Sequence, residues 1–185
     1  TPPLHSALPH YRDGARLASA LTSGENDLTL ADIASLTDAF YIGGTKNGML
    51  LGEALVITNR ALAADFRYIM KQRGGMLAKG WLIGLQFEVL LENGLYFENA
   101  RHANEMAARL RKGLAAPGGR FIADSPTNQI FPILPRAAAQ ALAEQYGFER
   151  WGAGDDDFQP VRLVCSWATK EEDVEAFLAD LAKLM

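Results

Sequence analysis

The sequence predicts an α/β fold, in which short apolar strands alternate with amphipathic helices along the chain. Hydrophobic residues make up 49% of the 185 residues, which is enough for a sizeable core. Short apolar runs at residues 39–42, 54–58 and 161–167 have the length and composition of strands. A long amphipathic helix is expected between these runs, over residues 95–114.

The first part of the chain adds three helices to this pattern. Thr29 is the expected N-cap of a short helix over residues 30–36. A second helix is expected over residues 60–72. Residues 76–92 are apolar nearly all round, so we expect a buried helix there. The Asn-Gly pair at residues 93–94 is its stop signal.

The second part has shorter strands and two further helices. Strands are expected over residues 120–123 and 129–134, and a helix over residues 136–146. Residues 169–172 form a capping-box sequence that opens the last helix, expected over residues 170–183. The change in character predicts two domains, residues 1–94 and 95–185.

Charge and composition exclude several classes of protein. Lys and Arg number 18 against 22 Asp and Glu, and no basic stripe stands out, so we expect no nucleic-acid partner. The apolar stretches are shorter than a membrane span, so we expect no membrane partner. The single cysteine, Cys165, leaves no internal disulfide and fits a reducing, cytoplasmic compartment. No His or Cys has partners at metal-ligand spacing, so no metal site is expected.

Lys46 is the first candidate functional residue. It lies in the Tyr-Ile-Gly-Gly-Thr-Lys-Asn-Gly segment of residues 41–48, between two strand-like runs. Glycines on both sides let the backbone approach a ligand closely. A lysine held there can shift its pKa and attack a carbonyl group. Taken alone, however, the octapeptide favours a surface turn with a solvated lysine.

A second cluster is the Asp-Gly-Ala-Arg sequence of residues 13–16. Alone it would be interpreted as a turn with an exposed ion pair. Together with Lys46, the cluster supplies what a pyridoxal phosphate site requires: an amine to form the imine, a carboxylate to keep the pyridine nitrogen protonated, and an arginine for a carboxylate or phosphate. The candidates for these functions are Lys46, Asp13 and Arg16.

The chain resembles the threonine aldolase/β-eliminating lyase family of pyridoxal-phosphate enzymes, which have the aspartate-aminotransferase fold. The segments that carry the resemblance are residues 13–16, 38–48, 52–54 and 72–80. The resemblance implies that residues 1–94 are the C-terminal part of the large cofactor-binding domain, with a mainly parallel sheet, and that residues 95–185 are the small α/β domain. The phosphate loop and the ring-stacking residue of the family precede this region, so we expect them outside these 185 residues.

The resemblance also implies a role for each candidate site residue. Lys46 corresponds to the Schiff-base lysine, and Asp13 to the acid that pairs with the pyridine nitrogen. Arg16 corresponds to an arginine near the substrate carboxylate and the cofactor phosphate, and Thr45 to a hydroxyl residue near that phosphate. Arg162 corresponds to the arginine that binds the substrate α-carboxylate. Without the resemblance, Arg162 would be interpreted as a strand-edge arginine in an ion pair.

The activity implied is that of a low-specificity L-threonine aldolase. Such an enzyme cleaves β-hydroxy-α-amino acids, such as threonine or allo-threonine, to glycine and an aldehyde, and we expect a homodimer or homotetramer. One alternative within the family is a β-eliminating lyase, which would release a keto acid and ammonia. Another is a truncated, non-catalytic relative that retains the lysine segment, residues 41–48.

Overall fold

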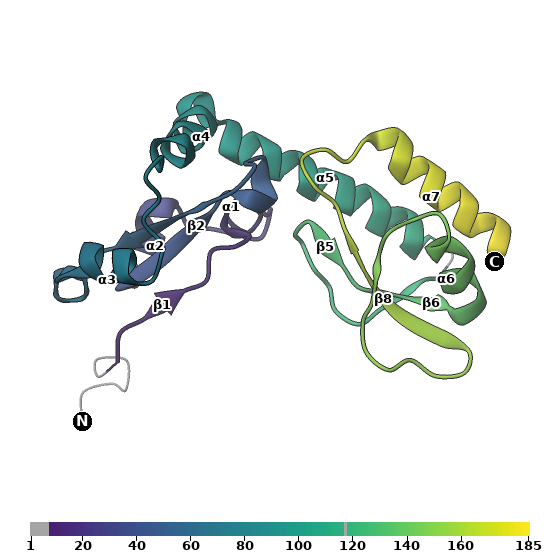
Figure 1. Cartoon of the computed structure of the whole chain (residues 1–185). Coiled ribbons are helices and arrows are strands. Elements are labelled where there is room, and N and C mark those ends of the chain that lie inside the picture. The colour runs from purple at the N-terminus through teal and green to yellow at the C-terminus, as the bar shows by residue number, and fades with distance from the viewer. Residues whose placement is uncertain (1–7, 117) are drawn as a thin grey trace. The chain divides into compact units, whose positions relative to one another are not determined.

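The computed structural model describes residues 8–116 and 118–185. These residues form two compact units (Figure 1). The first is made of the described residues up to Leu21 and of Asn26–Phe97, and the second of Thr22–Glu25 and Glu98–Met185. Each unit has its own sheet.

A three-stranded sheet in the order β1-β2-β3 organises the first unit. β1 (Tyr11–Arg12) pairs in parallel with β2 (Ala39–Gly43), and β2 pairs antiparallel with β3 (Glu53–Ile57). The sheet is therefore mixed, where a mainly parallel one was expected. The cause is the connection over residues 44–52, which is shorter than the roughly dozen residues that a parallel crossover needs.

Two short helices follow β1 in the first unit. These are α1 (Leu17–Leu21) and α2 (Leu30–Leu36). The predicted N-cap of α2 is confirmed, since the hydroxyl of Thr29 accepts a hydrogen bond of 3.2 Å from the Asp32 amide. The Asp32 carboxylate accepts one of 2.8 Å from the Thr29 amide in return, which completes a capping box.

The helix expected over residues 60–72 is divided in two. A short 3-10 helix, η3 (Arg60–Ala63), precedes α3 (Phe66–Gln72). Asp65 lies between them with a φ of 53°, a left-handed conformation that no continuous helix contains. The hydrophobic periodicity continues across this break, and so it could not indicate the interruption.

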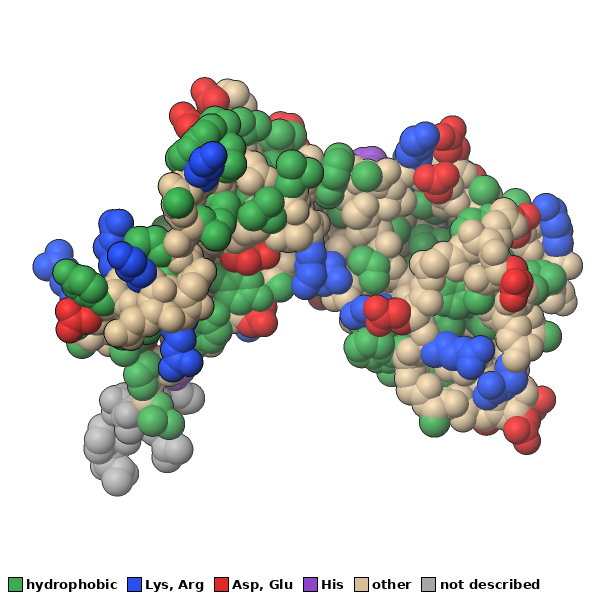
Figure 2. Space-filling model, in the orientation of Figure 1, with side chains coloured by type: hydrophobic (Ala, Val, Ile, Leu, Met, Phe, Trp, Pro, Cys, Tyr) green, Lys and Arg blue, Asp and Glu red, His purple; other side chains and the backbone are tan. Residues whose placement is uncertain are grey.

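The apolar helix expected over residues 76–92 is shorter and far less buried than predicted. It forms α4 (Trp81–Leu91), and only Phe87 and Leu90 are buried. Trp81 is 64% exposed, and hydrophobic side chains gather on the surface over this helix (Figure 2). The prediction of burial is wrong for this chain on its own, because its first unit offers a surface to only one side of α4.

The expected helix stop after α4 is confirmed. Asn93 and Gly94 have φ values of 58° and 76° within the short η4 (Glu92–Gly94). Such left-handed residues end a helix and satisfy its last carbonyl groups. The long helix α5 (Leu95–Ala115) begins directly afterwards, close to the predicted residues 95–114.

The sheet of the second unit is antiparallel. Its strand order is β4-β6-β8-β5, and β7 also pairs with β8. The strands are β4 (Arg120–Phe121), β5 (Gln129–Ile130), β6 (Pro132–Pro135), β7 (Glu149–Arg150) and β8 (Phe158–Val164). The single strand expected over residues 129–134 is therefore two strands, and β7 was not predicted.

Helices cover one face of this sheet. They are α5, α6 (Arg136–Ala143) and α7 (Glu171–Leu184), and Figure 1 shows them together on one side of the strands. Their buried side chains form one core with alternate residues of β8, Val161 and Leu163. Successive strand residues point to opposite faces, which leaves Arg162 on the side away from this core.

The capping box expected at residues 169–172 is absent. α7 begins after Lys170, whose side chain makes no capping hydrogen bond. The Thr169 hydroxyl instead accepts a hydrogen bond of 2.8 Å from the Ser166 amide. The prediction is wrong because a Thr hydroxyl can accept a hydrogen bond from an amide in a turn as readily as from an amide at a helix start.

Cys165 is 3% exposed and lies in the core of the second unit as a free thiol. No helix in the described part of the chain has the length and apolar character needed to span a bilayer. Over residues 8–116 and 118–185, no three His, Cys, Asp or Glu side chains converge as metal ligands would.

Candidate functional site in the first unit

The parallel pair β1–β2 places two candidate residues at the same edge of the sheet. Asp13 directly follows β1, and the short 3-10 helix η2 (Thr45–Asn47), which carries Lys46, follows β2. The carboxyl ends of parallel strands are the usual position of ligand sites in α/β folds. The Lys46 ammonium group is near enough to contribute to a lowered pKa of Asp13.

Two hydrogen bonds hold the Asp13 carboxylate. The hydroxyl of Tyr41 donates to its Oδ1 at 2.6 Å, and the Ala15 amide donates to the same oxygen at 2.9 Å. The pKa of Asp13 is lowered first by the Tyr41 hydrogen bond and then by that of Ala15, with smaller contributions from the charges of Lys46 and Arg12. The same contact raises the pKa of Tyr41 to about 12, so the carboxylate stays ionised and the phenol stays protonated at neutral pH.

Two glycines allow the backbone segments of the site to meet. The Gly43 amide donates a hydrogen bond of 3.0 Å to the Gly14 carbonyl. A Cβ atom on Gly14 would lie 1.6 Å from the Tyr41 carbonyl oxygen, and one on Gly43 would lie 2.6 Å from the Gly14 carbonyl oxygen. Any side chain at either position would therefore separate Asp13 from residues 44–48, which carry Lys46 and are called the lysine turn below.

The lysine turn is closed by hydrogen bonds to the start of β3. The Gly44 amide donates to Glu53 Oε2 at 2.8 Å, and the hydroxyl of the exposed Thr45 donates to the Gly52 carbonyl at 3.3 Å. Gly48 ends η2 with a φ of 112°, which favours glycine. The turn is thus fixed at both ends.

A buried anchor fixes the residue beside the lysine. Asn47 Nδ2 donates a hydrogen bond of 2.6 Å to the Tyr96 carbonyl, and the Tyr96 hydroxyl donates one of 3.0 Å to the Gly43 carbonyl. Tyr96 is fully buried, and this burial raises its pKa to about 12. Lys46 itself is exposed, so a rigid support carries a solvent-accessible amine.

The predicted arginines belong to different units. Arg16 is half-buried in the first unit, three positions beyond Asp13. Arg162 lies in the second unit, where its Nη2 atom is 2.6 Å from Glu149 Oε2 and its guanidinium group lies 4.9 Å from the centre of the Trp151 ring. The Arg162 Nε atom is buried and has no hydrogen-bond partner among the described residues. The ion-pair interpretation of Arg162 therefore describes the structure, and its carboxylate-binding role stays a prediction.

The site also contains residues that the sequence patterns did not single out. Tyr41, Asn47 and Tyr96 hold Asp13 and the lysine turn in place. Tyr41 and Asn47 lie inside the lysine segment, where their polar groups were a visible signal. Tyr96 had none, because its contact with Gly43 spans 53 positions.

Known proteins resemble this chain in sequence and in fold. The β-eliminating lyase family matches residues 5–136. A low specificity L-threonine aldolase from a Pseudomonas species is 34% identical over 181 residues, covering 95% of this chain and 50% of that enzyme. Its counterpart from Pseudomonas aeruginosa is 33% identical over 179 residues, with the same coverage. The chain thus spans about half the length of these relatives.

Solved structures extend the comparison to the fold. A threonine aldolase from Leishmania major superposes with a TM-score of 0.94 at 49% identity, covering 97% of this chain and 52% of the other. A serine palmitoyltransferase from Sphingomonas wittichii gives a TM-score of 0.62 at 17% identity, with coverages of 94% and 46%, and supports the fold alone. The expected α/β fold is confirmed, and since the family match spans well over half of its residues, the chain belongs to the β-eliminating lyase family.

Proposed function

We propose that this chain forms part of a pyridoxal-phosphate-dependent lyase that cleaves β-hydroxy-α-amino acids, such as threonine and allo-threonine, to glycine and an aldehyde. The observation that carries the proposal is the position of Lys46 and an ionised Asp13 at one edge of the β1–β2 pair. The similarity to low specificity L-threonine aldolases supports the reaction class. The described residues 8–94 would then belong to the cofactor-binding domain and residues 95–185 to the small domain.

The chemistry of the site suits pyridoxal phosphate. A carboxylate that stays ionised is the partner needed to keep the pyridine nitrogen protonated, and the contacts of Asp13 with Tyr41 and Ala15 hold it in that form. Lys46 would bond to the aldehyde group of the cofactor, and Thr45 would contact its phosphate. When bound, the cofactor supplies an electron sink for the bond that breaks at Cα.

Substrate orientation is assigned to the two arginines. Arg16 and Arg162 would bind the substrate carboxylate, because a guanidinium group matches carboxylate geometry with two parallel hydrogen bonds. Fixing the carboxylate sets the direction of the Cα–Cβ bond, and correct orientation contributes substantially to catalysis.

The exposed apolar helix α4 supports an assembly of copies. Its side chains are hydrophobic on nearly all sides, yet only Phe87 and Leu90 are buried. Exposed apolar patches of this kind mark surfaces that bind other protein. We propose at least a homodimer, commonly a homotetramer, in the cytoplasm, a compartment that fits the single free Cys165. Native mass spectrometry of the protein at its natural length should show these oligomers, and monomers alone would contradict the proposal.

The decisive experiment for the activity is the substitution Lys46→Ala. It should abolish both glycine formation and the visible absorbance of lysine-bound pyridoxal phosphate. Lys112→Ala, at an exposed lysine of α5, is the matched control and should preserve both. A Lys46→Ala protein that keeps the absorbance band would show that the lysine is misassigned, whereas a parent protein that never develops the band would favour a non-catalytic relative.

The family match favours one second candidate, a β-eliminating lyase. The same residues would serve it, since both reactions need the lysine, the carboxylate and the carboxylate-binding arginines. Product analysis separates the two: glycine and an aldehyde support the aldolase, and a keto acid with ammonia supports β-elimination.

A further inference from the structure

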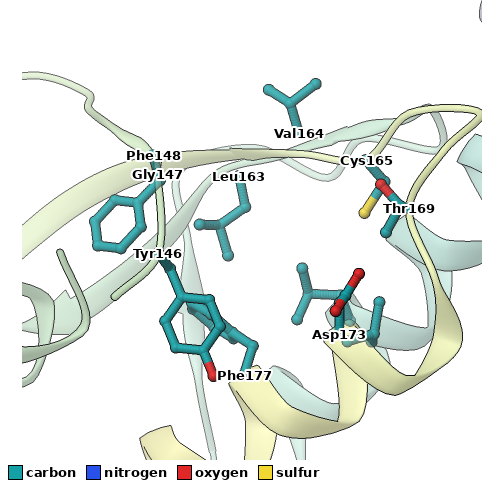
Figure 3. Close-up of a pocket in the computed structure, with 11 residues that line it drawn as sticks. Tyr146, Gly147, Phe148, Leu163, Val164, Cys165, Thr169, Asp173 and Phe177 are labelled. Atoms are coloured by element: carbon teal, nitrogen blue, oxygen red, sulfur yellow. The ribbon is translucent and has the colours of Figure 1, made fainter. Parts of the chain in front are cut away.

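The second unit contains a partly open pocket of about 140 Å³ between β8 and α7 (Figure 3). Leu163 and Cys165 line it from the strand side, and Val174 and Phe177 from the helix. All four of these residues are buried. The pocket is therefore an apolar hollow at the border of the core.

Aromatic rings form one end of the pocket. Tyr146 and Phe177 meet edge-to-face with ring centres 5.0 Å apart, and Phe148 meets Phe177 edge-to-face at 6.5 Å. The Tyr146 hydroxyl donates a hydrogen bond of 2.7 Å to Asp180 Oδ2, which fixes the ring. These rings add apolar surface to that end of the pocket.

Asp173 is an acidic side chain in the pocket lining and lies in the exposed first turn of α7. Neither a hydrogen bond nor an ion pair to its carboxylate occurs within the described residues. The neighbouring Lys170 pairs with Glu172 at 3.0 Å instead. Asp173 is therefore a negative charge at the mouth of the pocket without a cationic partner.

The pocket is separate from the proposed carboxylate site. Leu163 and Cys165 point into it, whereas the side chain of Val164 points away (Figure 3). Arg162 shares the face of Val164, because alternate strand residues lie on one side. The proposed substrate-binding arginine and this pocket thus occupy opposite faces of β8.

We infer that this pocket binds a small organic ammonium ion whose body is an aromatic ring or a branched alkyl group. An apolar cavity of about 150 Å³ accommodates a benzene ring, so a pocket of about 140 Å³ suits one ring or its aliphatic equivalent. The ammonium group lies at the mouth beside Asp173, and the ring packs among Leu163, Val174 and Phe177. The assignment is independent of the proposed lyase activity.

Three probes of equal size and different charge test the inference. Benzylamine, benzyl alcohol and benzoate are titrated separately into the protein at its natural length by calorimetry at neutral pH. Benzylamine should bind about five-fold more tightly than benzyl alcohol, the gain that one partly exposed ion pair provides. Benzoate should bind more weakly than either.

Matched variants and a positional readout complete the test. Asp173→Asn should reduce the preference for benzylamine over benzyl alcohol to less than two-fold. Glu175→Gln removes an equal charge from the same helix outside the pocket and should leave the preference unchanged. The methyl NMR signals of Leu163 and Val174 should shift on titration. Equal binding of benzylamine and benzyl alcohol, an unaltered preference in Asp173→Asn, or shifts confined to other residues would overturn the inference.

Discussion

The hydroxyl of Tyr41 donates a 2.6 Å hydrogen bond to the carboxylate of Asp13, across 28 positions of sequence. Parallel pairing of Arg12 with Phe40 sets this contact, because it aligns the next residue along each strand direction, Asp13 with Tyr41. The contact makes the largest contribution to the lowered pKa of Asp13. A residue of the lysine segment therefore maintains the charge of the carboxylate on which the proposed cofactor depends.

Removing this hydroxyl should raise the pKa of Asp13. In Tyr41→Phe the pKa should move up towards its ordinary value of 3.8 and stay below it, because the Ala15 amide still donates. Because the pKa of Asp13 is lower in the folded state than in the unfolded state, its ionised carboxylate stabilises the fold at pH values above the unfolded-state pKa. This contribution is lost as the pH falls through the folded-state pKa. The variant should therefore lose stability relative to the parent above about pH 4 and converge with it in stronger acid.

Carboxyl-carbon NMR titration of Asp13 measures the effect directly. Tyr68→Phe, at a tyrosine that is 72% exposed, serves as the control and should leave the Asp13 titration unchanged. An identical Asp13 titration in Tyr41→Phe and the parent would mean that the hydroxyl does not set the charge.

Gly14→Ala should disrupt the site through its backbone. The new Cβ atom would lie 1.6 Å from the Tyr41 carbonyl oxygen, so β1 and β2 must separate. Overpacking of this kind costs about 1–3 kcal/mol, and a clash with backbone falls at the upper end or beyond. Urea denaturation measures the loss. Gly24→Ala, where a Cβ atom meets nothing within 4 Å, should stay within about 0.5 kcal/mol of the parent; equal stabilities for the two variants would refute the account.

Tyr96→Phe should loosen the support of the lysine turn. The substitution keeps the buried ring and removes the donor to the Gly43 carbonyl, which is left buried without that partner. Such an orphaned group costs about 1–3 kcal/mol of unfolding free energy. Hydrogen exchange should report faster opening at Asn47, whose amide bonds to the Gly44 carbonyl within the same turn. Unchanged exchange at Asn47 would show that the hydrogen bond from the Tyr96 hydroxyl does not stabilise the lysine turn.

The sequence predicted correctly those features that are determined by residues only a few positions apart. The capping of α2 by Thr29 and the stop at Asn93-Gly94 depend on residues within a few positions, and both are present. The strand β2 likewise follows from its own apolar run. These features need no knowledge of the rest of the fold.

The features that escaped prediction depend on distant partners. The burial of α4 depends on what covers it, and the helix pattern alone cannot say whether this chain supplies that cover. The strand β7 was missed because it has two residues and is defined only by its pairing with β8. The candidates Lys46 and Asp13 were found from residue type, whereas their supports Tyr41 and Tyr96 became visible only through the sheet register.

The pair of Arg162 and Glu149 yields a prediction about substrate affinity. Glu149 Oε2 lies 2.6 Å from the guanidinium group that we propose binds the substrate carboxylate. The glutamate side chain is 62% exposed, so it can move away from Arg162 while losing little buried surface. Under this proposal, Glu149 would compete with the substrate for the same cation.

Glu149→Gln should accordingly lower the KM for the amino acid by about two- to five-fold, the range that a partly exposed ion pair provides, with little change in kcat. Arg162→Lys should raise the KM, because a lysine lacks the bidentate geometry. Steady-state kinetics on both variants separates the two claims. An unchanged KM in Arg162→Lys would remove Arg162 from the substrate site, whereas a raised KM in both variants would make Glu149 a support that holds Arg162 in position rather than a competitor.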